Sequence, residues 1–287
     1  MFAIVVGVLA FAVLVAVGAR LTFERRMERE IEVLLADARS PVRRLVTNQD
    51  LEALPGAVQR WLRHSNVVGS RVPRIVRLRQ DGQFQMEGRG WKPFEAEQYF
   101  TINPPAFLWK ATFRMAPLLW VTGRDRYRAG EGSIEMRVLS LLPVANKTGG
   151  GLNQGDLLRF LGELQWFPAA ALEEYIRWDA IDSHSARATM TYGGTAGSMT
   201  FRFDASGRLI ESTAVRYNDA RGRNEPWVNR NDSDREFSDI PVPAAGEARW
   251  EYEVGPYPYI RWRVTSIEYD HLSRFERWRH WRVAEGG

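Results

Sequence analysis

Carboxylate side chains in polar surroundings are the residues of this sequence that could carry out acid–base chemistry. They occur in three places: Asp125 between two arginines in the run GRDRY, Asp156, and the pair Glu173 and Glu174. A carboxylate acts as a general acid or base only within hydrogen-bond reach of a substrate. Each place also has a structural interpretation. GRDRY alternates as a strand with its charges toward water, Asp156 follows a helix N-cap at Asn153, and the glutamates continue an exposed helical turn. The sequence leaves an enzyme open but favours a protein without catalytic residues.

Other catalytic and metal-binding patterns are absent from the sequence. It contains no cysteine, which excludes thiolate nucleophiles, thiolate metal sites and disulfides. No serine stands in a GxSxG context, and the run TGGGLNQGD lacks the Lys-Ser/Thr ending of a phosphate-binding loop. The histidines are far apart and show no zinc-ligand spacing: His64, His184, His271 and His280. We therefore expect no metal and no cofactor.

The composition favours a large apolar core or pocket over a nucleic-acid interface. The 287 residues include 11 Trp, 14 Phe and 9 Tyr, side chains that bury large areas and line apolar pockets. The net charge is only +4, and the arginines are spread along the chain instead of forming one basic stripe. We expect no nucleic-acid partner.

The N-terminal run MFAIVVGVLAFAVLVAVGA contains no charged side chain. As a helix it would be roughly 28 Å long, close to the hydrocarbon thickness of a bilayer. We expect residues 1–20 to form a transmembrane anchor that contacts the bilayer through residues 1–19. A cleaved signal peptide is the alternative, because small residues occur at Ala16 and Gly18. The nearby arginines all follow the segment, which favours a cytoplasmic domain in a single-pass protein.

Residues 21–48 are expected to form a charged helical stalk and a linker. Ile31, Leu34, Leu35 and Ala38 fall on one side of this helix. A solvated stalk and a helix lying on the membrane surface both fit the pattern.

Residues 49–270 are expected to form an antiparallel β domain with two helices, near 55–64 and 153–167. Hydrophobic residues recur with a period of two in most of this region; in FLWKATFRM, Phe107, Trp109 and Phe113 share one face. Turn signals such as QDGQ, RAGEG and DASGR separate the runs. We expect roughly ten strands, within the usual range for one open sheet.

The helix near 153–167 indicates how such a sheet is covered. Ten strands spaced by about 4.8 Å would make a sheet roughly 45 Å wide, whereas a helix is only about 10 Å across. The sheet must therefore curl around the helix, whose apolar stripe includes Leu157, Phe160, Leu161 and Leu164. The predicted fold class is mainly β (α+β): a large curved antiparallel sheet, or half-barrel, wrapped around a central helix, with an N-terminal transmembrane helix.

A half-barrel can keep space between its sheet and its helix, and aromatic side chains would line that space. The residues predicted to bind a lipid or another apolar ligand come from the apolar strand faces and the helix: Trp109, Phe113, Met136, Phe160, Leu164, Trp166, Phe201, Trp250 and Trp262. The leading hypothesis is therefore a membrane-tethered module for an apolar ligand. Alternatively, these side chains pack against each other, and the domain is a β scaffold or interaction domain without a ligand.

Residues 271–287 are expected to form a tail rich in arginine and tryptophan. Arg274, Arg277, Trp278, Trp281 and Arg282 could lie on anionic lipid or on an acidic protein. An equally good interpretation is that the tryptophans cover the edge of the sheet.

Two stretches of the chain resemble a family of uncharacterised bacterial proteins. They are RMAPLLWVTGRDRYRAGEGSIEMRVLSLLPVANKTGGGLNQGDLLRFLGELQWFP and REFSDIPVPAAGEARW, within a region from about Leu54 to Tyr269, and GDLLRFLGELQWFP is the most specific run. The family has no assigned activity, so it implies no catalytic residues. It places the anchor in a bacterial cytoplasmic membrane.

The half-barrel around a helix also resembles, in architecture, the lipoprotein carriers of the LolA-like fold. Those carriers hold acyl chains between the concave face of the sheet and the helices, outside the cytoplasm. The resemblance implies an apolar ligand and an extracytoplasmic domain. Because the arginine distribution favours the cytoplasmic side, the side of the membrane stays open.

Overall fold

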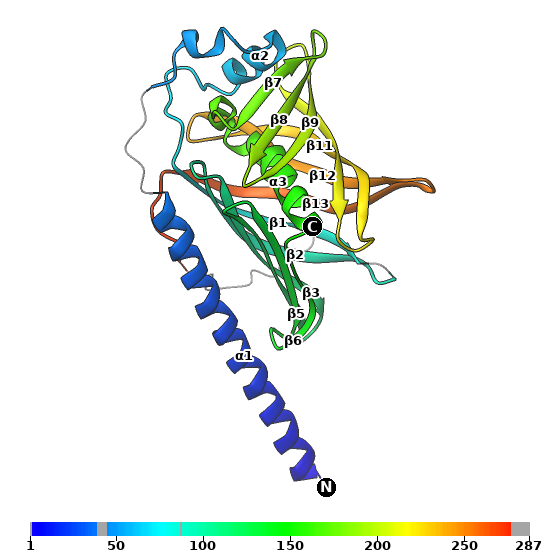
Figure 1. Cartoon of the computed structure of the whole chain (residues 1–287). Helices are drawn as coiled ribbons and strands as arrows, with labels where there is room; N and C mark the ends of the chain where they lie inside the picture. Colours follow the sequence, from blue (N-terminus) through cyan, green and yellow to red (C-terminus); the bar gives the residue numbers. More distant parts are fainter. Residues whose placement is uncertain (1, 39–44, 87, 277–287) are drawn as a thin grey trace.

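A single antiparallel sheet of thirteen strands forms the body of the protein (Figure 1). The computed structural model describes residues 2–38, 45–86 and 88–276. From one edge to the other the strand order is β6-β5-β4-β3-β2-β1-β13-β12-β11-β10-β9-β8-β7, so β1 and β13 meet at the centre of the sheet. The strands are β1 (Ile75–Met86), β2 (Gly90–Thr101), β3 (Ala106–Ala116), β4 (Leu119–Arg128), β5 (Glu131–Val138), β6 (Leu142–Thr148), β7 (Ile176–Ala180), β8 (Ser185–Tyr192), β9 (Thr195–Phe203), β10 (Leu209–Asn218), β11 (Arg223–Phe237), β12 (Ile240–Tyr252) and β13 (Gly255–Tyr269).

The prediction of roughly ten strands was wrong, because several strands carry no alternating apolar pattern. Edge strand β6, with the sequence LPVANKT, has mostly exposed side chains. The expected turn QDGQ lies inside β1, which continues to Met86. Gly82 is needed there, since a Cβ on it would lie 2.0 Å from the carbonyl oxygen of Arg261 on the neighbouring strand. Such polar runs are held as strands by backbone hydrogen bonds, from β5 alone in the case of β6 and from both β2 and β13 in the case of β1, rather than by burial of an apolar face.

The sheet curls until its two halves approach each other, with α3 (Gly151–Glu163) on its concave side (Figure 1). α3 packs mainly on β4, β5 and β6 of one half and on β8, β9 and β10 of the other. The β4–β5 and β8–β9 turns touch at Gly130 and Gly193, where a Cβ on Gly130 would lie 2.6 Å from the Cα of Gly193. Lys147 Nζ on β6 also donates a hydrogen bond of 2.7 Å to the carbonyl oxygen of Asp219, beyond β10. The predicted half-barrel around a central helix is confirmed.

α3 begins earlier than its sequence indicates. Its N-cap is Gly150, which has a φ of 58°, a backbone conformation that glycine readily adopts. Asn153, the predicted N-cap, instead accepts a hydrogen bond of 2.9 Å from the backbone N–H of Gly132 on β5. After Glu163 the chain continues as two 3₁₀ turns, Leu164–Trp166 and Pro168–Leu172.

A short helix, α2 (Gly56–His64), packs near β8 and follows the 3₁₀ turn Asn48–Leu51. Its residue Trp61 is fully buried and stacks on Phe203, with ring centroids 5.6 Å apart. Trp61 also stacks on Phe201 at 6.1 Å. These rings make the apolar core continuous from α3 to this end of the sheet.

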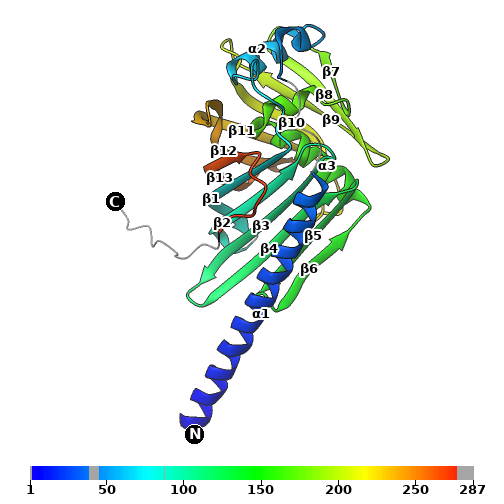
Figure 2. The ribbon, with the colours of Figure 1, turned by 90° about the vertical axis from the view of Figure 1, so that its left-hand side faces the viewer.

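α1 (Phe2–Asp37) is one continuous helix, and its C-terminal half lies on the outer face of the sheet (Figure 2). Ile31, Leu34 and Leu35 are buried in a cluster with Tyr99 of β2 and Leu108 of β3. Ion pairs surround this contact; they join Glu24 to Lys110, Arg26 to Glu135, Glu30 to Arg124, and Asp37 to Arg128. The solvated stalk expected over residues 21–48 is therefore wrong for this helix, because its apolar side is covered by β2 and β3 and not by water.

The N-terminal half of α1 projects beyond the sheet (Figures 1 and 2). Across the described part of the chain, no helix is both long enough and apolar enough to span a bilayer, so the predicted transmembrane helix is not found.

The start of the predicted C-terminal tail lies against α1 and β2. Arg274 Nη1 is 3.3 Å from Glu28 Oε1 on α1. Phe275 is buried beside Tyr99, and its backbone N–H donates a hydrogen bond of 3.0 Å to the Tyr99 hydroxyl. The other tail residues predicted to contact lipid or protein, Arg277, Trp278, Trp281 and Arg282, lie outside the described residues.

The contact of α1 with the outer face predicts a position-specific loss of stability. Leu34→Ala removes a side chain that is 1% exposed, and we expect the free energy of unfolding to fall by about 2–5 kcal/mol. The neighbouring Val33 is 48% exposed, so Val33→Ala should change it by less than about 0.5 kcal/mol. Chemical denaturation followed by tryptophan fluorescence measures both. Equal effects of the two substitutions would show that α1 is not held on the sheet.

Candidate functional site

The nine residues predicted to bind an apolar ligand lie mostly in a packed core. Eight of them are buried members of one hydrophobic cluster, and Met136 is partly buried against it. They do not surround one common space. Trp166 meets Trp262 edge-on at 5.3 Å, whereas Phe201 lies near α2, 5.1 Å from Trp178. The apolar side of α3 and of the turn after it, with Phe160 and Leu164, is buried in this packed core, and the other six residues belong to the same core: Trp109, Phe113, Trp166, Phe201, Trp250 and Trp262.

A row of aromatic rings continues from this core across the centre of the sheet. We call it the aromatic strip; it consists of Phe84 on β1, Tyr259 on β13, Trp250 on β12 and Trp227 on β11. Neighbouring ring centroids in this row are 5.8, 5.7 and 6.5 Å apart. The indole N–H of Trp227 donates a hydrogen bond of 3.0 Å to the Tyr259 hydroxyl, which fixes both side chains. Phe84 and Tyr259 remain partly exposed, so one end of the strip reaches solvent.

Two predicted residues extend the strip toward the other half of the sheet. Phe113 meets Phe84 edge-on at 5.2 Å. Met136 lies beside Phe113 over Gly123, where a Cβ would be 2.8 Å from the Met136 sulfur and 3.2 Å from the Phe113 ring. The absence of a side chain at Gly123 thus makes room for both. Of the predicted ligand residues, Trp250 belongs to the strip, and Phe113 and Met136 lie next to it.

Sequence reasoning missed Phe84 and Tyr259, although a signal was present. Phe84 and Met86 alternate with glutamines in QFQM, but the preceding QDGQ was interpreted as a turn. Tyr257 and Tyr259 alternate in the same way in PYPYI. Period-two patterns at the ends of long strands therefore pointed to an aromatic face.

A network of buried charged side chains joins α3 to both halves of the sheet. On one side Arg159 of α3 forms ion pairs with Asp125 of β4 and with Glu163, whose Oε2 accepts a hydrogen bond of 2.8 Å from Gln98 of β2. On the other side Arg216 of β10 donates a hydrogen bond of 2.7 Å to the carbonyl oxygen of Gly155. Arg216 also lies 3.6 Å from Asp156 on α3. The network holds α3 in one position between the two halves.

Asp156 is the most perturbed titratable group of this network. It is 1% exposed, and burial together with the neighbouring Asp125 raises its pKa well above the ordinary value, although Arg216 and Arg159 oppose the shift. Within the described residues, Asp125 Oδ1 and Asp156 Oδ2 have no hydrogen-bond donor. A proton on Asp156 allows its carboxyl group to donate a hydrogen bond to Asp125, so that one of these oxygens becomes the donor and the other the acceptor.

These positions correct the structural interpretations of the predicted acid–base residues. In GRDRY, Asp125 points inward to α3 and is 6% exposed, while Arg124 and Arg126 contact Glu30 on α1 instead of water. Asp156 is buried and does not cap the helix. Glu173 is buried whereas Glu174 is exposed. Because Asp125 and Glu163 are buried and paired with Arg159, they help to hold α3 in position.

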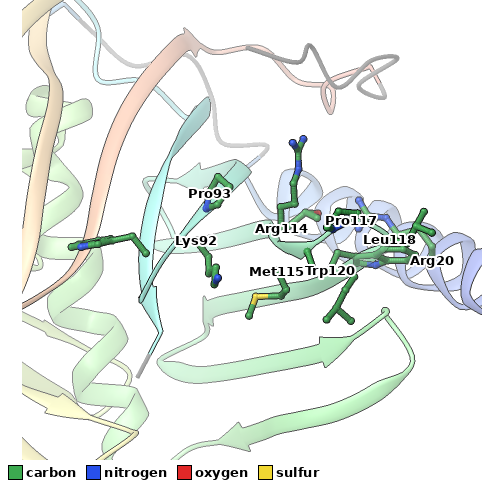
Figure 3. Close-up of a pocket in the computed structure, with 12 residues that line it drawn as sticks. Arg20, Lys92, Pro93, Arg114, Met115, Pro117, Leu118 and Trp120 are labelled. Carbon is green, nitrogen blue, oxygen red and sulfur yellow. The ribbon is translucent and has the colours of Figure 1, made fainter. Parts of the chain in front are cut away.

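The described residues contain no group of histidine, aspartate and glutamate side chains that could hold a metal ion. A pocket of about 810 Å³ opens elsewhere, on the outer face between the N-terminal end of β2, the β3–β4 hairpin and α1 (Figure 3). Its lining includes none of the nine predicted residues; it consists of Arg20, Trp91, Lys92, Pro93, Thr112, Arg114, Met115, Ala116, Pro117, Leu118, Leu119 and Trp120.

The chain belongs to a family of unknown function, DUF6544, whose model matches residues 44–262. This confirms the resemblance to an uncharacterised family. No curated protein matches the chain. Among solved structures, the chain is similar to the crystal structure of the LolA superfamily protein NE2245 from Nitrosomonas europaea. The identity is 7%, the match covers 74% of this chain and 93% of that one, and the TM-score is 0.36.

The raised pKa of Asp156 predicts how stability depends on pH. Above the ordinary aspartate value of 3.8 the unfolded chain has lost this proton, while the folded chain keeps it up to a higher pH. The free energy of unfolding therefore falls as pH rises through this window. In Asp156→Asn the side chain is neutral at every pH and resembles the protonated form. The parent chain loses stability as pH rises, so we expect the free energy of unfolding of the variant minus that of the parent to be larger at about pH 8 than at about pH 4.

Denaturation curves at the two pH values measure this difference. Glu253→Gln, which changes an exposed carboxylate on the β12–β13 turn, is the control and should differ from the parent chain by less than about 0.5 kcal/mol at both. A constant difference between Asp156→Asn and the parent chain would contradict the raised pKa.

Proposed function

We propose that this member of the DUF6544 family is a membrane-associated module that holds an apolar molecule against the aromatic strip. The observation that carries the proposal is the partial exposure of Phe84 and Tyr259 at the end of a row of otherwise buried rings. The proposed ligand site therefore does not lie against α3, where side chains fill the interior. It lies on β1, β13, β12 and β11, whereas α3 packs mainly on other strands.

The chemistry of the strip favours an apolar ligand with a flat or chain-like shape. Aromatic faces and methionine side chains bind apolar groups through large and adaptable contact areas. Met115 and Met136 are partly exposed and pack on the same core as the strip. Arg216 lies over the Trp227 ring at 4.8 Å and is held by α3, so it supports the buried end of the strip. At the exposed end Lys92 of β2 is the cross-strand partner of Phe84, which places a cation beside the apolar site.

Exposed apolar side chains support the membrane association. Along the projecting half of α1 they are Phe2, Ile4, Val6, Phe11, Val13, Leu14, Val15, Val17 and Leu21. Two hairpins end on the side of the molecule from which this helix projects (Figures 1 and 2). Exposed leucines stand at their tips: Leu118 and Leu119 where β3 passes into β4, and Leu141 and Leu142 where β5 passes into β6. Val144 follows on β6 and is also exposed. So large a set of exposed apolar residues on one side of a protein is typical of a surface that meets a partner or a membrane.

The aromatic strip predicts a loss of ligand binding on substitution. Phe84→Ala combined with Tyr259→Ala removes the two exposed rings, and we expect the affinity for the apolar fluorophore 1-N-phenylnaphthylamine to fall at least about tenfold. The control is Val254→Ala, because Val254 is 96% exposed on the β12–β13 turn and lies outside the strip. Fluorescence titration of the full chain measures the affinities. Unchanged binding by the double variant would refute a site on the strip.

The hairpin tips predict which parts of the domain touch a bilayer. The chain has no cysteine, so Leu118→Cys, Leu142→Cys and Val254→Cys each give one labelling position. With an environment-sensitive fluorophore attached, we expect vesicles to raise the emission at positions 118 and 142, and nitroxide-bearing lipids to quench it. Position 254, on a different turn, should respond to neither. A response that is equal at the three positions, or present only at 254, would contradict this orientation.

A further inference from the structure

Lys92 of β2 lies on the concave face of the sheet, beside the exposed end of the aromatic strip. It is the cross-strand partner of Phe84, and such partners point to the same face of a sheet. Lys92 also borders the pocket of Figure 3, but its side chain and that of Met115 extend to one side of the sheet, whereas Arg114 extends to the other. Lys92, Phe84 and Met115 are all partly exposed. One cation therefore stands among partly exposed apolar side chains.

The acids of β2 lie on the opposite face from Lys92. Glu95 and Glu97 alternate with the inward-facing residues of this strand, and Glu97 is paired with Lys110 at 3.3 Å. Among the described residues, no acid lies within ion-pair distance of Lys92. Within this part of the chain, its ammonium group is thus available to an anion that does not belong to the protein.

Two other cations on the concave side already have partners. Arg159 of α3 forms two buried ion pairs. Arg216 of β10 is held by the backbone of α3 and lies over the Trp227 ring, at the buried end of the strip. Of these three cations, Lys92 is the one that stands at the exposed end, where a ligand can reach it.

The partly exposed rings of the strip lead away from Lys92. Phe84 lies on the next strand, β1, and Tyr259 lies on the strand after it, β13. Two strand spacings of about 4.8 Å place β13 roughly 10 Å from β2. This arrangement suits a ligand that has an anionic group at one end and a chain of several methylene groups, rather than a short organic acid or a neutral hydrocarbon.

We propose that the apolar ligand of the strip is a long-chain carboxylic acid, such as a fatty acid, whose carboxylate binds Lys92. The ammonium group donates a charge-assisted hydrogen bond to the carboxylate, and the acyl chain lies on Phe84 and Tyr259. One lysine matches the single negative charge of a carboxylate. The inference rests on the proposed function and adds to it the charged group of the ligand and the direction in which its chain lies.

The test compares dansyl-aminoundecanoic acid with its methyl ester, which has the same chain but no charge, by fluorescence titration of the full chain. We expect Lys92→Gln to weaken binding of the acid by about tenfold, because it removes one charge-assisted hydrogen bond. Binding of the ester should not change, which also shows that the variant is folded. Lys92→Arg keeps the charge and should retain most of the affinity for the acid.

The matched control is Arg187→Gln, which removes the same charge from an exposed position on β8. It should bind the acid as the parent chain does, because charges farther away than about 10 Å are screened. An equal loss of acid binding in Lys92→Gln and Arg187→Gln would overturn the site, and so would an equal loss of acid and ester in Lys92→Gln. Unchanged binding of both ligands by Lys92→Gln would overturn the carboxylate site and keep the apolar one. A parent chain that binds neither ligand would overturn both proposals.

Discussion

The buried contact of α3 with both halves of the sheet is the interaction on which the rest of the structure depends. Thirteen antiparallel strands give a sheet too wide for one short helix to cover, so the apolar face is buried only if the sheet curls. Arg159 and Asp125 join α3 to one half as a buried ion pair, and Arg216 joins it to the other through the carbonyl oxygen of Gly155. Buried ion pairs contribute little net stability, but the loss of one partner is costly, so such a network specifies a single arrangement. Here it specifies how far the sheet closes.

This closure divides the molecule into two faces with different roles. On the concave face the rings beneath α3 are packed, and the strip beyond α3 keeps partly exposed rings for a proposed ligand. On the outer face α1 covers β2 and β3, so that these two strands are buried on both sides: Phe100 and Phe107 face inward, while Tyr99 and Leu108 face α1. The helix thus fixes the proposed membrane surface relative to the concave face.

Much of the architecture could be predicted from the sequence, because period-two patterns such as Phe107, Trp109 and Phe113 report directly on a half-buried strand. The curl followed from the width of the sheet and the size of the helix. The outer contact of α1 could not be predicted in this way. Ile31, Leu34 and Leu35 were recognised as one apolar side, but nothing local shows whether water, membrane or protein covers it.

The site was harder to predict, for a physical reason. An aromatic residue on an apolar strand face gives the same pattern whether it packs in a core or lines an open site. Only the tertiary packing shows that Phe201 is buried against Trp61 of α2, whereas Phe84 stays partly exposed. The inward direction of Asp125 was hidden too, because the alternation of GRDRY gives two faces without showing that both are covered.

The central claim is that an apolar molecule contacts the aromatic strip. The most direct measurement is photo-crosslinking of the full chain in vesicles with a fatty acid that carries a diazirine in its chain, followed by peptide mass spectrometry. The account predicts adducts on β1 and β13 near Phe84 and Tyr259, in addition to those on α1 and the hairpin tips. Adducts confined to α1 and the hairpin tips would contradict it, because they would show a membrane contact without a ligand on the concave face.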